Sequence, residues 1–319
     1  MIGEQTIDRY RAVTLADRMG KIEVAFVPEA GMVGCSLRHR GEELLGQRGG
    51  LRNYVDQRST MGIPLLYPWA NRLSERRFRC ADRTVDLDLA SPPPSVDPNG
   101  KPIHGLLAAA DGWLIEHREP ADDGGSISAR FEFGAERQLI EAFPFPHTIW
   151  IEADLRGPEL TVTTTVEPTG EAAVPVAFGF HPYFRLPGIE RSAWRIEIPV
   201  TERLELDRDM IPTGDRRPVA VESGPLGSRT FDDAYTAPPD SAPLVLEGGG
   251  RRIEVRLGPG YPYTQVYAPA DDDVVALEPM TAPTNALVRG GPELTLVPPG
   301  QSYTAGFSVR VLDAEGRVT

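Results

Sequence analysis

The sequence predicts an all-β protein, a large antiparallel β-sandwich with few short helices. Apolar residues recur at every second position in many short runs, the pattern of strands that turn one face toward a core. Glycine and proline are frequent, with 32 and 31 among 319 residues, and they separate these runs as turn residues do. No apolar period of about 3.6 residues persists over three turns, which argues against long helices and an α/β fold.

The alternating runs begin near the N-terminus, where segment 21–27 places Ile22, Val24 and Phe26 on one face of a strand. Three successive runs, at 126–133, 147–155 and 159–167, are expected to form an antiparallel meander. Further strands are predicted at 194–200, 243–248, 251–257, 273–278, 293–298 and 302–312. Short strands that follow one another along a chain are typical of a sandwich.

One short helix is predicted, at 136–143. Pro144 is expected to end it, because proline disfavours helical geometry in the residue before it. The proline-containing segments 91–100 and 236–243 are interpreted as surface loops, since strand-like sequence resumes on both sides of each. No polar linker divides the chain, so residues 1–319 are expected to form a single domain.

The composition argues against several classes of protein. A formal net charge of −13 disfavours nucleic acid and anionic membranes as partners. Neither Cys35 nor Cys80 lies near a second Cys or a His at metal-ligand spacing, which argues against a zinc site and a disulfide scaffold. We recognise no signal peptide and no membrane-spanning apolar segment, and therefore expect a soluble, cytoplasmic protein.

Polar side chains interrupt the strand pattern in five segments. These are 62–73 with Asn71 and Arg72, 101–107 with His104, 177–184 with His181, 230–236 with Asp232 and Asp233, and 276–287 with Glu278. Taken singly, each has an ordinary structural explanation: a core histidine, a strand end, an ion pair, a turn residue or a loop cap. His181 and Glu278 both precede a proline, which restricts each to an extended backbone and suits a preorganised acid and base.

Taken in order, the segments NRL, HGLL, FGFHPYF, DDAYT and LEPMTAPTNAL resemble the signature of the aldose 1-epimerase (galactose mutarotase) family. The HPYF and EPMTAPTNA segments are the most specific, because each joins a functional residue to a longer context. The resemblance spans most of the chain. It implies a galactose-mutarotase-like β-supersandwich with an open sugar cleft on one sheet, and no required metal or organic cofactor.

The resemblance also implies which residues form the site. It makes His181 the general acid and Glu278 the general base, and it assigns sugar binding to Asn71, Arg72, His104 and Asp232. Asp232 fits the family pattern better than Asp233 because Tyr235 follows it by three residues, where the family more often has Phe. The implied partner is a small sugar, an aldohexose such as glucose or galactose.

An acid and a base fit the interconversion of sugar anomers. The reaction removes the C1 hydroxyl proton and protonates the ring oxygen, which opens the ring before it closes on the other carbonyl face. A carboxylate is a ready base at neutral pH, and an imidazole can give and regain a proton. We expect the two groups on opposite sides of the reacting centre, and the sugar ring stacked against aromatic residues such as Trp69, Phe178 and Tyr183.

The sequence leaves three alternatives and the oligomeric state open. A hexose-6-phosphate 1-epimerase would need basic groups at the cleft mouth, for which Arg76, Arg77 and Arg79 are available. A non-catalytic carbohydrate-binding sandwich would keep the fold, although both proposed catalytic groups are present. A glycoside hydrolase would use two carboxylates, such as Asp232 and Glu278.

Overall fold

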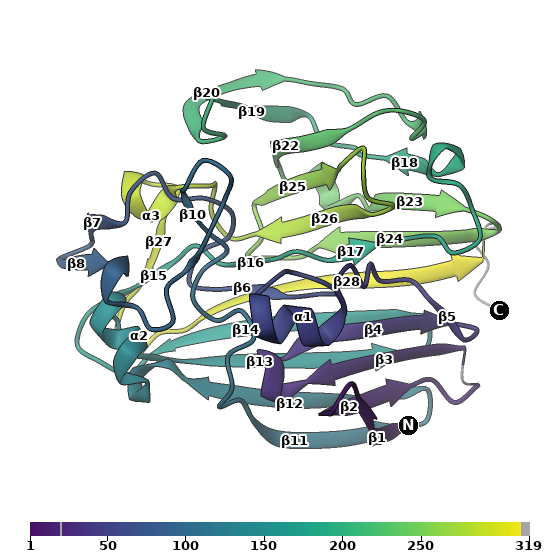
Figure 1. Ribbon diagram of the computed structural model, residues 1–319, viewed down its shortest axis with the longest axis horizontal. Helices are drawn as coiled ribbons and strands as arrows, with labels where there is room; N and C mark the ends of the chain where they lie inside the picture. The colour runs from purple at the N-terminus through teal and green to yellow at the C-terminus, as the bar shows by residue number, and fades with distance from the viewer. Residues whose placement is uncertain (20, 314–319) are drawn as a thin grey trace.

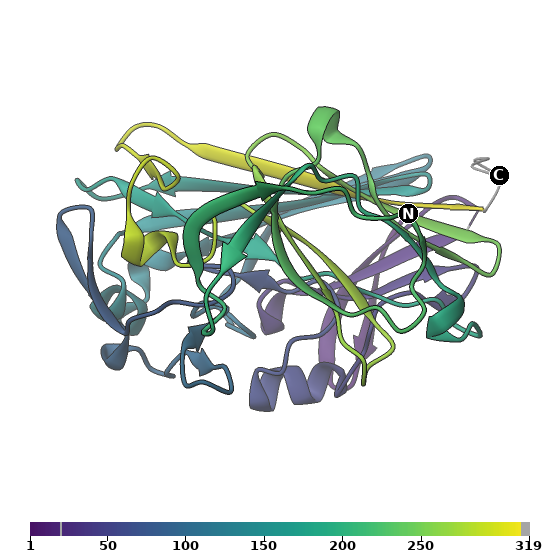
Figure 2. The ribbon, with the colours of Figure 1, turned by 90° about the horizontal axis from the view of Figure 1, so that it is seen from above.

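Stacked layers of β-sheet build the protein, and the computed structural model describes residues 1–19 and 21–313. Strands make up 49% of the structure and helices 11%, which confirms the all-β prediction. Seen from above, one long sheet runs across the upper part of the molecule and the other sheets lie beneath it (Figure 2). The site described below lies on these other sheets.

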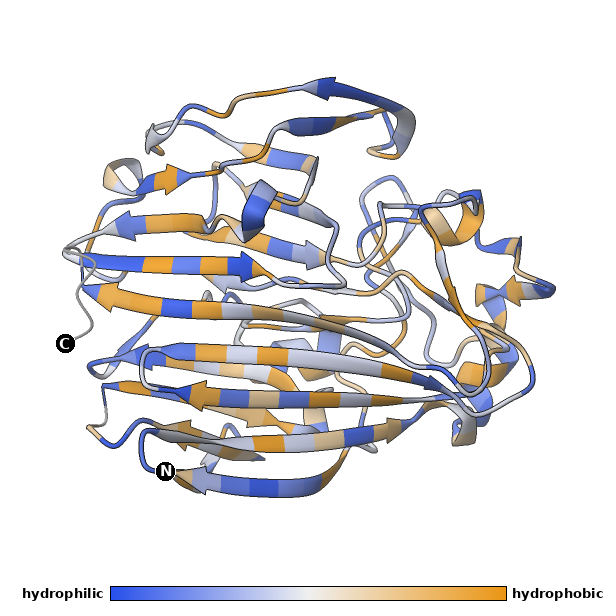
Figure 3. Ribbon diagram, turned by 180° about the vertical axis from the view of Figure 1, so that it is seen from behind, coloured by the Kyte–Doolittle hydropathy of each residue, from blue (hydrophilic) through white to orange (hydrophobic). Residues whose placement is uncertain are grey.

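The long sheet has nine strands in the order β11-β12-β13-β14-β28-β24-β23-β18-β21 (Figure 1). Their bounds are Leu114–Ala121 (β11), Gly124–Glu132 (β12), His147–Arg156 (β13), Glu159–Pro168 (β14), Tyr303–Asp313 (β28), Arg251–Leu257 (β24), Leu244–Gly248 (β23), Arg195–Glu197 (β18) and Gly224–Pro225 (β21). The predicted meander is confirmed as β12, β13 and β14, which pair antiparallel in that order. Hydrophobic and hydrophilic residues alternate along these strands (Figure 3), as expected of a sheet with one face on the core.

A second sheet of eight strands carries most of the candidate site. Its order is β20-β19-β22-β25-β26-β16-β6, and β17 also pairs with β26. Their bounds are Pro212–Pro218 (β20), Glu202–Leu206 (β19), Phe231–Thr236 (β22), Tyr263–Ala268 (β25), Val275–Met280 (β26), Gly179–Phe180 (β16), Leu65–Leu66 (β6) and Tyr183–Phe184 (β17). The predicted strand at 273–278 is therefore present, but it continues through Pro279, and Glu278 lies within it rather than at its end.

The N-terminal residues form a five-stranded antiparallel sheet in chain order. Its strands are Ile2–Ile7 (β1), Tyr10–Ala16 (β2), Ile22–Val27 (β3), Val33–His39 (β4) and Glu42–Glu43 (β5). Only β3 was predicted from its alternation. β4 is buried at nearly every position, so it has no polar face to alternate, and β1 has apolar residues only at its two ends.

Short elements complete the fold. Three two-stranded ribbons pair Arg77–Cys80 (β7) with Arg83–Asp86 (β8), Ser95–Val96 (β9) with Pro102–Ile103 (β10), and Val174–Val176 (β15) with Thr295–Val297 (β27). The α-helices are Gly50–Gln57 (α1), Arg137–Ala142 (α2) and Ala286–Arg289 (α3). The predicted helix at 136–143 is confirmed as α2, and in the part of the chain described here no helix is long and apolar enough to cross a membrane.

Aromatic side chains join the second sheet to the long sheet. Phe180 on β16 packs on Phe307 of β28, with ring centres 5.1 Å apart. Both are buried members of one core cluster that also contains Val255 and Leu277. Because neighbouring residues point to opposite sides of an extended strand, anchoring Phe180 in the core turns the next residue, His181, toward the opposite side.

Candidate active site

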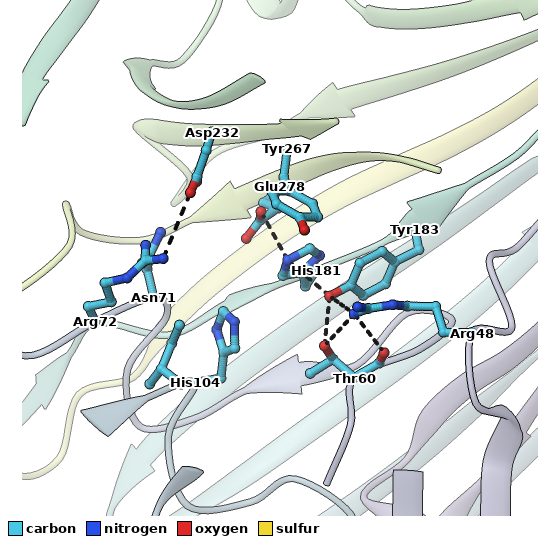
Figure 4. A pocket seen from close by; sticks show the side chains of 11 residues that line it. Arg48, Thr60, Asn71, Arg72, His104, His181, Tyr183, Asp232, Tyr267 and Glu278 are labelled. Carbon is cyan, nitrogen blue, oxygen red and sulfur yellow. Dashed lines mark hydrogen bonds and ion pairs between the residues drawn. The ribbon is translucent and has the colours of Figure 1, made fainter. Parts of the chain in front are cut away.

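A pocket of about 180 Å³ brings together all six residues predicted to form the site (Figure 4). Its lining consists of Arg48, Thr60, Asn71, Arg72, Ile103, His104, His181, Tyr183, Asp232, Tyr267 and Glu278. The predicted residues come from segments more than 200 positions apart in the chain, and strand pairing places them around one cavity.

His181 lies between β16 and β17, where backbone hydrogen bonds hold the chain on both sides of it. Its amide donates to the Pro64 carbonyl over 3.2 Å, and the Tyr183 amide donates to the Gly62 carbonyl over 2.9 Å. On the other side, Gly179 allows the chain to approach β26 closely, because a Cβ there would lie 2.6 Å from the Pro279 carbonyl oxygen. The His181 imidazole therefore extends from a backbone that is hydrogen-bonded on both sides of it.

Glu278 projects into the pocket from β26 and touches His181. It is 1% exposed, and its Oε1 lies 3.3 Å from His181 Nε2. The expectation that the two groups stand on opposite sides of the reacting centre is therefore wrong for this structure. The strands on either side of His181, β16 and β17, both pair with β26, and this pairing brings the two side chains into contact.

Burial favours the neutral form of each member of this pair. It raises the pKa of Glu278 well above its usual value, with the negative charge of Asp232 adding to the effect and Arg72 opposing it. Burial also lowers the pKa of His181 well below its usual value, and electrostatic interactions with His104 and Arg48 act in the same direction. Glu278 Oε2 and His181 Nδ1 have no hydrogen-bond partner among the described residues.

Two short segments pair to place the predicted sugar-binding residues. The His104 amide donates to the Asn71 carbonyl over 3.0 Å, and Arg72 forms a bridge with Ile103. Asn71 and His104 both adopt positive φ angles, 58° and 63°, which turn the chain sharply at each residue. The pairing brings both polar side chains to the same wall of the pocket.

Side-chain oxygens of three residues contact the Arg72 guanidinium. Its Nε donates to Asp97 over 2.8 Å and its Nη1 to Asn71 over 3.0 Å, and Nη2 lies 3.8 Å from Asp232. Such a fixed fork of donors suits the recognition of hydroxyl groups.

The structure places Asp232, and not Asp233, in the pocket. The two alternate along β22, so their side chains point to opposite faces. Asp232 accepts a hydrogen bond of 2.6 Å from Gln265, whereas Asp233 pairs with Arg203 at 2.5 Å, away from the pocket. Burial raises the pKa of Asp232, and Arg72 and Gln265 counteract that rise.

His104 is a neutral polar group on the pocket wall. Burial lowers its pKa to about 3, and the nearby Arg72 and Arg48 charges act in the same direction. Its Nδ1 has no partner among the described residues, and its ring lies 5.4 Å from that of His181. A neutral imidazole has one donor and one acceptor nitrogen, which matches a sugar hydroxyl.

The sequence analysis missed four residues of the pocket wall, the apolar Ile103 and the polar Arg48, Thr60 and Tyr267. Tyr267 follows Gln265 by two positions on β25 and therefore shares its face. Gln265 is 2% exposed, and a polar amide in that strand is a signal that could have pointed to this face. Arg48 and Thr60 lie in the loops around α1, and no pattern in the sequence marks either residue.

The prediction that the sugar ring stacks against Trp69, Phe178 and Tyr183 is wrong for two of these three residues. Trp69 and Phe178 are 1% and 0% exposed and belong to the hydrophobic core rather than to the pocket. Tyr183 does line the pocket, but its ring stacks on His181 with ring centres 4.1 Å apart. The sequence could not distinguish a core aromatic from a pocket aromatic, because both lie in apolar runs.

The basic residues that favoured a phosphorylated substrate lie away from the pocket. Arg76 pairs with Asp88 at 2.6 Å and Arg77 with Asp86 at 3.7 Å, and Arg79 is exposed on β7. None of the three lines the pocket. The two arginines that do, Arg48 and Arg72, are each paired with an aspartate.

The pocket can therefore move protons between adjacent groups and bind hydroxyl-rich molecules. Its wall presents fixed donors and acceptors around the contact of His181 with Glu278. Within residues 1–19 and 21–313, no cluster of three or more His, Cys, Asp or Glu side chains is arranged to hold a metal ion. Cys35 and Cys80 are both buried and unpaired.

A family model described as aldose 1-epimerase matches residues 25–310 of the chain. Among curated proteins, the chain is 26% identical over 266 residues to the uncharacterized protein YphB of Escherichia coli K12. The aligned region covers 77% of this chain and 82% of that protein.

Solved structures share the fold over nearly the whole chain. A galactose mutarotase-like protein from Clostridium acetobutylicum has a TM-score of 0.84 at 18% identity, with 98% of each chain covered. A protein from Synechocystis sp. PCC 6803 has a TM-score of 0.77 at 24% identity, with 97% of this chain and 98% of that chain covered. A homologue of GalM/aldose epimerase from C. elegans has a TM-score of 0.71 at 14% identity and covers 98% of this chain and 99% of its own.

Proposed function

The chain belongs to the aldose 1-epimerase family, and from this premise we propose that it interconverts the α and β anomers of a free aldohexose such as glucose or galactose. The observation that carries the proposal is the 3.3 Å contact between His181 Nε2 and Glu278 Oε1 in a pocket lined by hydroxyl-binding groups. The two oxygens that exchange protons in this reaction are bonded to the same carbon atom. A neighbouring acid and base can therefore reach both.

Ring opening needs one proton to move at each oxygen. His181 donates its Nε2 proton to the ring oxygen as the bond from that oxygen to C1 breaks, and Glu278 accepts the proton of the C1 hydroxyl. The product is the open-chain aldehyde, with a neutral imidazole and a protonated carboxyl in the pocket. After rotation about the C1–C2 bond, ring closure returns both protons and restores the starting state of the pair.

Burial assists the opening step. The charged pair of imidazolium and carboxylate is costly in a pocket that removes water, and opening converts it to two neutral groups. The directions of the pKa shifts support this argument, since burial raises the pKa of Glu278 and lowers that of His181. Because the two groups share one proton, they titrate as a pair and not as separate residues.

Four further residues bind the sugar in this proposal. Arg72 and Asn71 form one donor and acceptor group at the pocket wall, while Asp232 and His104 each leave polar atoms directed at the cavity. Tyr267 offers an aromatic surface beside them. Hydroxyl groups at several ring carbons can therefore be satisfied while C1 faces His181 and Glu278.

A free sugar is favoured over a hexose 6-phosphate. A phosphate group is recognised by unpaired basic side chains, and both arginines of the pocket already pair with aspartates. We expect glucose 6-phosphate to compete poorly with glucose in a polarimetric assay. A clear preference for the phosphate would overturn the choice of free sugar but leave the reaction intact.

The deciding experiment follows the optical rotation of freshly dissolved α-D-glucose and α-D-galactose with and without the protein. We expect the wild type to accelerate the change, and His181→Ala and Glu278→Gln to lose about 10²-fold or more of that activity, since each proton-transfer group contributes roughly 10²–10⁴-fold. His117→Ala and Glu171→Gln are matched controls on exposed positions. Wild-type protein that accelerates no common aldose, while folded by circular dichroism, would contradict the proposal and favour a non-catalytic sugar-binding protein.

The pH profile of the reaction should be bell-shaped. At low pH the pair gains a second proton and the base is lost, and at high pH it loses its only proton and the acid is lost.

A glycoside hydrolase with Asp232 and Glu278 as its carboxylates would instead release reducing sugar from glycosides. We expect no such release in a reducing-sugar assay.

A further inference from the structure

The hydroxyl group of Tyr183 lies at the centre of a hydrogen-bonded group beside the catalytic pair (Figure 4). Its oxygen is 2.6 Å from Thr60 Oγ1 and 3.2 Å from His181 Nε2. Arg48 Nη1 donates to the same oxygen over 3.1 Å, and Asp272 holds the Arg48 Nε at 3.2 Å. Tyr183 is 2% exposed, so these bonds are largely shielded from solvent.

The chemistry of these groups leaves the Tyr183 proton two possible directions. A guanidinium has no acceptor atom, so Arg48 can only donate to the tyrosine oxygen. The single O–H of Tyr183 can then point to Thr60 Oγ1 or to His181 Nε2, but not to both. It can point to His181 only when Nε2 carries no hydrogen.

We propose that Tyr183 is a positioning residue whose hydroxyl turns between Thr60 and His181 as the imidazole loses and regains its Nε2 proton. The inference rests on the proposed function. While Nε2 is protonated, its hydrogen is directed at Glu278 or at the sugar ring oxygen, and Tyr183 donates to Thr60. Once His181 has given its proton to the ring oxygen, the bare Nε2 accepts the hydrogen bond of Tyr183.

Tyr183 keeps its own proton throughout, so the number of protons on the catalytic pair is unchanged. Burial raises the pKa of its phenol above the usual value, in agreement with a group that does not ionise. The two rings stack with centres 4.1 Å apart and an interplanar angle of 16°, which holds the side chains at a fixed separation and keeps the hydroxyl beside Nε2 while it turns. The turning hydroxyl stabilises the neutral imidazole and thereby makes His181 a stronger acid.

Other ionisable groups also face His181. They are Glu278 on β26, Tyr267 on β25, His104 after β10, and Arg48 after β5. His104 and Arg48 lower the pKa of His181 through space. Of the described side chains, only Glu278 and Tyr183 lie within hydrogen-bond distance of Nε2.

Two variants test the proposal because it predicts shifts of opposite sign. Tyr183→Phe removes the hydrogen-bond donor that stabilises the neutral imidazole. The pKa of His181 should therefore rise, and the pH profile of kcat should move upward by about 0.5–1 unit. Thr60→Val keeps the shape of the side chain but removes the alternative acceptor. The Tyr183 hydroxyl is then always available to Nε2, and the profile should move downward by a similar amount.

Two further variants serve as controls. Thr60→Ser restores the acceptor and should return the profile to the wild-type position. Tyr267→Phe removes another pocket hydroxyl, one whose ring lies 5.9 Å from that of His181, and should leave the profile in place whatever it does to KM. Shifts of the same sign in Tyr183→Phe and Thr60→Val, or no shift in either, would show that the contacts are only structural.

A measurement without substrate separates this proposal from the proposed function. The chain has five histidines, so the ¹⁵N signals of His181 can be assigned by comparison with His181→Gln. Nitrogen chemical shifts in the sugar-free protein should show Nε2 titrating higher in Tyr183→Phe and lower in Thr60→Val. If these opposite shifts appear but no aldose is converted, the hydroxyl switch stands and the proposed function fails; if the shifts are absent while aldose is converted, the reverse holds.

Discussion

Asp97 orients Arg72, the arginine proposed to bind the sugar, although it does not line the pocket. One carboxylate oxygen accepts from Arg72 Nε over 2.8 Å, and the other accepts from the backbone amides of Asn99 and Lys101. Burial alone would raise the pKa of Asp97, but these hydrogen bonds outweigh it and lower the pKa. One residue thus shapes the loop and fixes the direction of a guanidinium.

We expect Asp97→Asn to raise KM about tenfold or more with little change in kcat. The amide keeps one oxygen for the loop but presents an N–H group to Arg72 Nε, and a hydrogen bond to a charged group is worth about 1.5–3 kcal/mol. Polarimetric rates over a range of sugar concentrations separate KM from kcat. Asp88→Asn, which removes the exposed partner of Arg76, is the matched control, and equal KM values in the two variants would contradict the role of Asp97.

At the level of elements, the turn after β10 places His104 through one close backbone contact. Gly105 has a φ of +78°, and a Cβ there would lie 2.1 Å from the Tyr67 carbonyl oxygen. The Leu106 amide donates to that same carbonyl over 2.6 Å. The segment that carries His104 therefore rests on the chain beside β6, and only glycine permits that distance.

Gly105→Ala should destabilise the protein and weaken sugar binding together. The positive φ alone costs on the order of 1 kcal/mol for a residue with a Cβ, and the clash with Tyr67 must move the segment that carries His104. Thermal unfolding and KM measure the two effects. Gly100→Ala is the matched control, since Gly100 has a φ of +76° and nothing within 4 Å of the added Cβ. A Gly105→Ala variant as mild as Gly100→Ala would show that the contact is dispensable.

At the level of the whole molecule, the last strand joins distant parts of the chain. β28 pairs with β14 on one side and β24 on the other, and Phe307 on β28 packs on Phe180 beside His181. The long sheet is therefore incomplete until the C-terminal segment is in place. We propose on this ground that residues 1–319 form a single domain, as the sequence analysis expected.

The single-domain proposal predicts that Val309→Asp unfolds the whole protein in one transition. Val309 is 1% exposed and its neighbours across the sheet are Leu160 and Val255, so a carboxylate there should lower the free energy of unfolding by about 3 kcal/mol or more. Urea unfolding followed by circular dichroism and tryptophan fluorescence should give coincident curves. Ser308→Asp, on the opposite face of the strand, is the control. Two separate transitions would indicate independent domains.

Alternation along the chain was sufficient to predict the strands that bury one face. β12, β13 and β14 have polar residues on one side and apolar residues on the other, and both their positions and their pairing were predicted correctly. β4 was missed because it is buried on both faces. Helix α1 was missed because its amphipathic pattern lasts barely two turns and has only Leu51 and Tyr54 on its buried side.

The sequence by itself determined the fold class and six of the polar residues of the pocket, because short-range patterns and motifs carry that information in consecutive residues. Only the tertiary structure decided how those residues meet. Pairing of β26 with β16 and β17 places Glu278 against His181. The alternation of side chains along β22 directs Asp232, and not Asp233, into the pocket. Trp69 and Phe178 are buried in the hydrophobic core. These outcomes depend on which strands lie side by side and which face each residue turns to a neighbour, and contacts between distant segments leave no local pattern from which to predict them.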